Sequence, residues 1–207
     1  MKKAFLLIVA CTFALITAHA QDSEVERVNQ LTKAEQFKAN NSFIKESTIF
    51  TEKNSGMKLF AKLFTNLNNG EQIAALEIWP TVGSKLLTGG YLTPLGYLDM
   101  DQIDDLLLAL ETIVKETSNT SRKESYTITY TAPGGIDVIY IDDIATGAFG
   151  TAGGLVIFRK KWYQTNDYGV QTVNYSDATT NCSVKNLPKL IESIKEAQAI
   201  AQQALTK

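Results

Sequence analysis

The strongest constraint on the fold is the segment MKLFAKLFTNL at residues 57–67, in which two sets of side chains alternate without a break. Successive side chains of a β-strand point to opposite faces, so a period of two over this length predicts a strand. The turn-forming triplet Asn68-Asn69-Gly70 follows and predicts a hairpin into the segment EQIAALEIW at residues 71–79. One face of the first strand would carry Met57, Leu59, Ala61, Leu63 and Leu67, and the other Lys58, Phe60, Lys62 and Phe64.

The rest of the chain places further strands around two main helices. A short helical turn is expected after Ser23. Apolar residues spaced three and four apart predict one helix after residue 101 and another from Asn186. The first would bury Ile103, Leu106, Leu107, Leu110, Ile113 and Val114, and the second Leu187, Leu190, Ile191, Ile194, Ala197, Ala201 and Leu205. Strand patterns cover residues 43–51, 125–131, 136–141, 154–163 and 168–175.

This order of elements predicts the fold class. Tight turns between consecutive strands imply antiparallel pairing, and helices that follow blocks of strands imply an α+β fold rather than alternating βαβ units. We therefore predict a largely antiparallel sheet of about seven or eight strands, with two main helices packed on one face. No linker or repeat divides the sequence, so residues 21–207 are expected to form a single α+β domain.

The first 20 residues are predicted to be a signal peptide. Lys2 and Lys3 precede an apolar run at residues 4–17, and Ala18-His19-Ala20 has the small-residue pattern of a cleavage site. The run is shorter than the roughly 20 apolar residues that span a bilayer, so no integral membrane segment is expected after cleavage. Lipidation at Cys11 is the weaker alternative. We therefore expect a secreted or periplasmic protein.

Cleavage would also restrict the available chemistry. The leader contains the only histidine, His19, and one of the two cysteines. Catalysis by a serine–histidine or cysteine–histidine pair, histidine-ligated zinc and cysteine-rich metal sites would then be excluded, and no cofactor is expected. Cys182 is expected to be a small buried hydrophobe, with a disulfide to another chain as the alternative. The remaining 18 basic and 22 acidic residues give a charge of −4, so nucleic acid is not an expected partner.

The densest polar cluster is YLDMDQIDDLLLAL at residues 97–110, which contains Asp99, Asp101, Asp104 and Asp105. A calcium-binding loop would need a glycine at its sharp turn and a closing glutamate, but no glycine appears and apolar residues follow directly. Helix N-termini favour carboxylates, because their first amides are unbonded and carry a partial positive charge. The aspartates are therefore predicted to start a helix, with Asp99 or Asp101 as its cap, and no metal site is expected.

Two other segments resemble binding motifs. The segment GAFGTAGG at residues 147–154 lacks the lysine and the following helix of a phosphate-binding loop, so we expect a hairpin connection. The basic run Arg159-Lys160-Lys161-Trp162 could be an anionic docking patch, but alternation at a strand end favours charges that point into water.

Catalysis would have to depend on carboxylates or on a serine–lysine pair. Asp137, Asp142 and Asp143 lie near a strand end and could join Asp99 or Asp101 as the acid and base of a hydrolase acting on glycans. Acids at strand ends are usually solvated loop residues, so no catalytic residue is predicted and this hydrolase remains the alternative function.

The remaining candidate for a binding site is the stripe formed by Lys58, Phe60, Lys62 and Phe64. If no helix covers this face, exposed phenylalanines beside lysines would form a ligand-binding surface. If helices cover it, the same residues are core, with lysines that extend to solvent.

The chain resembles small exported bacterial proteins of unknown function. They carry a segment like YLDMDQIDDLLLALETI between two groups of strands and end in a helix like NLPKLIESIKEAQAI. The resemblance covers most of residues 31–206 and implies an α+β domain with no established activity, so it transfers no functional residue. The predicted signal peptide, the missing catalytic side chains and the Lys/Phe stripe favour an exported, non-catalytic module that binds an unknown ligand or protein partner over an enzyme.

Overall fold

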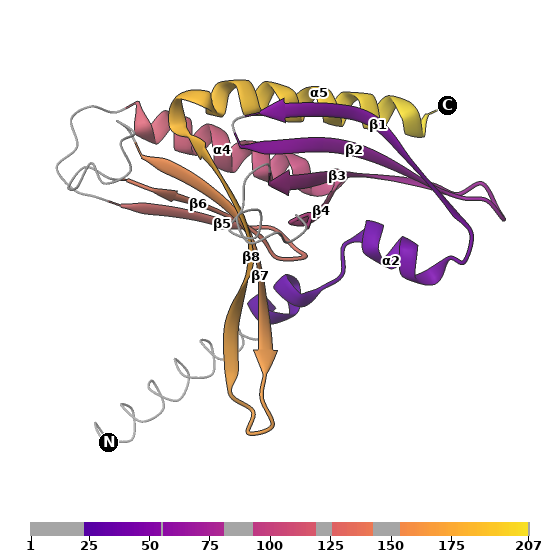
Figure 1. The fold of residues 1–207 in the computed structure, drawn as a ribbon, viewed down its shortest axis with the longest axis horizontal. Helices are drawn as coiled ribbons and strands as arrows, with labels where there is room; N and C mark the ends of the chain where they lie inside the picture. The colour runs from indigo at the N-terminus through magenta and orange to yellow at the C-terminus, as the bar shows by residue number, and fades with distance from the viewer. Residues whose placement is uncertain (1–22, 55, 81–92, 119–125, 143–153, 207) are drawn as a thin grey trace, which may run out of the picture.

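The computed structural model describes residues 23–206, apart from residues 55, 81–92, 119–125 and 143–153. Its described strands form two antiparallel four-stranded sheets, in the orders β1-β2-β3-β4 and β5-β6-β7-β8 (Figure 1). The α+β class and the antiparallel pairing are confirmed, but the prediction of a single sheet of seven or eight strands is wrong. Alternation shows that a strand has two faces and does not show which strand lies beside it.

The first sheet contains the predicted hairpin. Residues 67–71 connect β2 (Met57–Asn66) to β3 (Gln72–Pro80), and Gly70 has a φ of 75°, which the turn requires. Met57, Leu59 and Ala61 point into the main core, as the alternation predicted. The strands of this sheet are β1 (Ile44–Asn54), β2 (Met57–Asn66), β3 (Gln72–Pro80) and β4 (Gly96–Asp99).

The second sheet ends in a projecting hairpin. Its strands are β5 (Thr127–Thr131), β6 (Ile136–Ile141), β7 (Leu155–Thr165) and β8 (Gln171–Ser183). β6 pairs with β7 only as far as Lys160, so β8 is the only described strand beside the rest of β7. This part of β7 and β8 extends away from the body of the protein (Figure 1).

The two main helices, α4 (Ile103–Thr117) and α5 (Leu187–Leu205), share one core with both sheets. The helices contact each other, α5 lies over β1, β2 and β3, and α4 reaches β5. The predicted apolar stripes are buried, except that Val114 is partly buried and Leu205, in the last turn of α5, is 39% exposed. Cys182 is buried in the same core, as expected.

Within the described residues, two helices precede β1. Residues 23–29 are helical, which confirms the short helix expected after Ser23. The second helix, α2 (Lys33–Asn40), was not predicted, and it begins with a capping box between Thr32 and Glu35. It lies on the face of the first sheet opposite α5 (Figure 1), where Phe37 contacts a small second core. Helices therefore cover both faces of this sheet.

Several predictions concern residues outside the described part of the chain. These are the signal peptide at residues 1–20, Asp143, and most of the segment at residues 147–154. Among the described helices, none combines the length and the apolar character needed to cross a bilayer.

Candidate functional site

The aspartate cluster starts a helix, as predicted. Asp99 caps a short 3₁₀ helix (Met100–Gln102) that continues directly into α4. The side-chain oxygen of Gln102 accepts a hydrogen bond from the backbone amide of Asp99 at 3.2 Å. Asp104 and Asp105 lie in the first turn of α4 and are exposed, where the positive end of the helix dipole stabilises them.

Asp99 also caps a second helix. Its carboxylate accepts hydrogen bonds from the backbone amides of Lys33 at 2.7 Å and Ala34 at 3.2 Å, in the first turn of α2. The residue is 3% exposed, and this burial raises the pKa of Asp99 above its ordinary value, although the two amides oppose the shift. Asp99 therefore joins α2 to the start of α4, and its role is structural.

The other buried carboxylate among the candidate acids is also engaged in the fold. Asp137 lies within β6 and accepts hydrogen bonds from the hydroxyl of Thr131 at 2.6 Å and from Nε of Arg159 at 3.1 Å. Its side chain is 2% exposed. Across the described residues, no group of three or more Asp, Glu, His or Cys side chains is placed to hold a metal ion.

The predicted Lys/Phe stripe does not form one open surface. Lys58 is exposed and Phe60 is half-buried, in edge-to-face contact with Trp79 at 6.3 Å between ring centroids. Phe64 is completely buried under α2, in the small core that also contains Tyr97. A ligand could reach Phe64 only if α2 moved away.

The lysine in the middle of the stripe is engaged by carboxylates. Nζ of Lys62 lies 2.9 Å from Glu46 and 3.6 Å from Glu77, and Glu77 is 4% exposed. Burial lowers the pKa of Lys62, but the bonds to the two carboxylates outweigh it, so the pKa lies above its ordinary value. The lysine is therefore held as a cation by this sheet and is not a solvated charge.

The basic run on β7 is paired as well, and the prediction that it points into water is wrong. Each cation has an acidic partner from another segment: Arg159 bonds to Asp137, Lys160 lies 3.9 Å from Glu35, and Lys161 lies 2.9 Å from Glu24. Their side chains are only 26%, 24% and 12% exposed, respectively. Alternation along the strand could not show the burial of Lys160 and Lys161, because the N-terminal segment that contains Glu24 and Glu35 covers this part of β7.

A groove lies where the N-terminal segment crosses β7. Its volume is about 410 Å³, and it brings together the turn before α2, the β5–β6 turn and one edge of β7. Two large apolar side chains are exposed in it, Leu31 (53%) and Trp162 (38%). The Lys160–Glu35 ion pair lies beside them. The lining residues are Val28, Asn29, Gln30, Leu31, Glu35, Gly134, Lys160, Trp162 and Tyr163.

Specific polar contacts fix the wall that the N-terminal segment forms. The side-chain amide of Asn29 donates to the backbone oxygen of Tyr163 and accepts from its backbone amide, both at 2.8 Å. Glu24 accepts from Nζ of Lys161 at 2.9 Å and from the hydroxyl of Tyr163 at 3.0 Å. These bonds lower the pKa of Glu24 below its ordinary value. Asn29 thus takes the place of a neighbouring strand along this part of β7.

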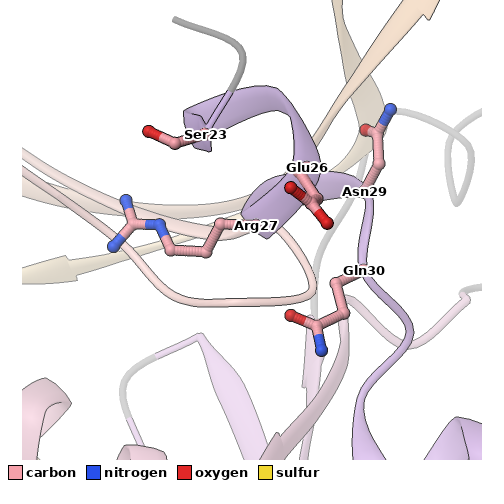
Figure 2. Close-up of a pocket in the computed structure, with 5 residues that line it drawn as sticks. All are labelled: Ser23, Glu26, Arg27, Asn29 and Gln30. Atoms are coloured by element: carbon pink, nitrogen blue, oxygen red, sulfur yellow. The ribbon is translucent and has the colours of Figure 1, made fainter. Parts of the chain in front are cut away.

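A second depression lies beside the helix at residues 23–29, with a volume of about 500 Å³, and shares Asn29 and Gln30 with the groove. Figure 2 shows its five lining side chains, which come from this helix and the residue after it. All five are exposed, and they spread around the helix without converging on one point. It therefore offers no set of groups that could hold a ligand together, and the groove beside β7 is the better candidate. The five residues are Ser23, Glu26, Arg27, Asn29 and Gln30.

Sequence reasoning found only part of this site. Trp162 lies in the basic run at residues 159–162, but no sequence pattern connects it with Leu31 and the other residues across the groove. The Thr32–Glu35 capping spacing could have indicated α2, whereas no local signal pairs Asn29 with a residue 134 positions later. No family model matches this sequence, and no curated protein matches it either.

Proposed function

We propose that this chain is an exported, non-catalytic module that binds a protein partner through the groove beside β7. One observation carries the proposal: Leu31 and Trp162 are exposed together in the groove, beside the Lys160–Glu35 ion pair. An exposed aromatic residue next to polar groups is typical of the centre of a protein interface.

The chemistry of the groove supports a peptide segment as the ligand. Its apolar part would receive one apolar side chain of the partner between Leu31 and Trp162. The ion pair at the rim would orient polar groups of the same segment. Because Asn29 and Glu24 fix the N-terminal wall to β7, the groove is formed before the partner arrives, and binding requires little additional ordering.

The test uses a random linear peptide library displayed on phage and selected for binding to the purified protein. Enriched peptides are then measured against Trp162→Ala, Leu31→Ala and a matched control, Leu108→Ala. Leu108 is 65% exposed on α4 and does not line the groove, so its truncation removes an apolar side chain that is even more exposed than Leu31 and Trp162. We expect at least a tenfold loss of affinity, corresponding to about 1.4 kcal/mol, for the two groove variants and no change for the control.

Two results would contradict the proposal. One is the absence of any enriched peptide. The other is a set of peptides that bind the wild type and both groove variants equally well, since their binding surface would then lie elsewhere.

A further inference from the structure

The edge strands of the two sheets differ in how they are protected. An unpaired edge is a template for another strand, and proteins protect it by charge, irregularity or short length. β4 and β5 are short, with four and five residues. β1 carries Lys45, Glu46, Glu52 and Lys53, and its register shifts between Thr48 and Phe50. β8 has 13 residues, and its outer part, QTVNY at residues 171–175, carries no charge.

Alternate residues in this part of β8 direct their backbone amide and carbonyl groups away from β7. On β7, Tyr163 bonds to Asn29 and the amide of Lys161 bonds to Gly135, so both direct their backbone groups away from β8. In an antiparallel pair, two opposite residues face the same way with respect to the ladder. Val173 lies opposite Tyr163 and Tyr175 lies opposite Lys161, so both direct their amide and carbonyl groups away from β7.

Gln171, two residues before Val173, has the same orientation. In the described part of the chain, no backbone hydrogen bond outside the β7–β8 ladder involves any of these three residues. The outer stretch of β8 therefore presents a row of open donors and acceptors.

The side chains at this edge are exposed and apolar. Val173 is 42% exposed and Tyr175 is 43% exposed, and their spacing of two places them on one face of the strand. Of the ten large apolar side chains that the described residues expose, five belong to this hairpin. They are Trp162, Tyr168, Val170, Val173 and Tyr175.

We infer that residues 171–175 of β8 pair with the same residues of a second copy of this chain, in antiparallel orientation. With the twofold axis at Val173, this valine faces its own counterpart, and Gln171 of one copy faces Tyr175 of the other. About six backbone hydrogen bonds form in the three pairs. The two sheets join into one of eight strands, because each copy contributes four.

Charge supports a second copy as the occupant. A twofold interface brings each charge close to its own copy, so any net charge at the edge would repel. Residues 171–175 have none, and the nearest cations on the same face are neutralised within their own copy. Arg159 bonds to Asp137 and lies 3.5 Å from the ring centroid of Tyr175, and Lys161 bonds to Glu24.

The dimer is expected to be weak and to leave the groove accessible. Five residues span only about 17 Å. Pairing along this short stretch buries much less surface than the roughly 1,600 Å² of a standard interface. The groove lies along the edge of β7 and the pairing surface along the edge of β8, which are opposite edges of one hairpin. The inference thus goes beyond the proposed function and can fail independently of it.

The test is sedimentation velocity of the purified protein from low micromolar to several hundred micromolar concentration. Val173→Pro removes the outward amide at an edge position, where proline is tolerated, and Val173→Lys places two like charges opposite each other. The matched control is Tyr168→Lys, which adds the same charge at the hairpin tip, where Tyr168 is 91% exposed.

We expect a concentration-dependent dimer for the wild type and for Tyr168→Lys, and at least a tenfold higher dissociation constant for both Val173 variants. If Val173→Pro loses its fold by circular dichroism, Val173→Lys decides the question. A wild type that stays monomeric at the highest concentration would overturn the inference. So would a dimer that both Val173 variants form as readily as the wild type.

Discussion

Replacing Asp99 by alanine should destabilise the protein strongly, because one carboxylate serves two helices. The change removes the acceptor of two backbone amides at the start of α2, at 2.7 and 3.2 Å from the carboxylate oxygens. Hydrogen bonds to a charged acceptor contribute about 1.5–3 kcal/mol each, and amides left without an acceptor in a buried site add to the loss. The buried charge itself is unfavourable, which offsets part of this gain. We expect unfolding free energy to fall by about 2–3 kcal/mol.

Asp101 provides a matched control two residues away. It forms an ion pair with Lys33 at 2.6 Å, but the two side chains are 61% and 65% exposed, respectively. Exposed ion pairs contribute about 0–1 kcal/mol, so Asp101→Ala should have little effect. Both variants lose one negative charge, and only Asp99→Ala loses the carboxylate that accepts the backbone amides of Lys33 and Ala34.

The measurement is equilibrium unfolding in urea, followed by tryptophan fluorescence and far-ultraviolet circular dichroism. The interpretation of Asp99 as a double cap is refuted if Asp99→Ala stays within about 0.5 kcal/mol of the wild type. It is also refuted if Asp101→Ala loses as much stability as Asp99→Ala.

The same residue predicts a pH dependence. Because burial raises the pKa of Asp99 in the folded state, the folded protein holds this proton more tightly than the unfolded chain. The resulting stabilisation is complete below the ordinary pKa of 3.8 and is lost as pH rises through the elevated folded value. The stability of the wild type relative to Asp99→Asn should therefore decrease as pH rises through this range and remain constant above it. An increase with pH would contradict the assignment.

Three further substitutions test the packing, two of them with a matched control. All are followed in the same unfolding assay, and Asn29→Ala is also followed by amide hydrogen exchange. Leu106→Ala should reduce the unfolding free energy by about 2–5 kcal/mol, because Leu106 is fully buried in α4. Leu108→Ala, on the exposed side of the same helix, should stay within about 0.5 kcal/mol of the wild type. Equal losses would contradict the helix orientation. Gly135→Ala should prevent stable folding, because the added Cβ would lie 2.1 Å from a backbone oxygen of β7. At Gly70 an added Cβ would have no atom within 4 Å, so Gly70→Ala should cost only about 1–2 kcal/mol of backbone strain. Asn29→Ala should speed amide exchange in residues 23–31 and reduce stability by about 1 kcal/mol, and unchanged exchange would show that this side chain does not hold the segment.

Local sequence patterns identified most elements of the fold. The β2–β3 hairpin was predictable because alternation and the turn triplet agree within 23 residues, from Met57 to Trp79. The start of α4 was predictable because an acidic cap and an apolar stripe follow each other directly. Helix α2 was missed because only Ala34 and Phe37 are buried in it, which gives too little periodicity to notice. The separation into two sheets depends on which strands pair, and no local pattern encodes this.

The candidate site was less predictable for the same reason. Asp99 was correctly expected to be a helix cap, but its bonds to α2 connect residues 65 and 66 positions apart. The charges of Lys160 and Lys161 were expected in water, because their acidic partners lie on a segment more than 120 residues earlier in the chain. Long-range pairing of this kind becomes visible only when the N-terminal segment is placed against β7.

The most direct test of the proposed function is a map of amide chemical shifts in the ¹H–¹⁵N correlation spectrum while a selected peptide is added. The groove predicts saturable shifts that cluster at residues 28–35, at Gly134 and at residues 160–163. Shifts that cluster instead at Lys58 and Phe60 would place binding on the open part of the first sheet and contradict the account.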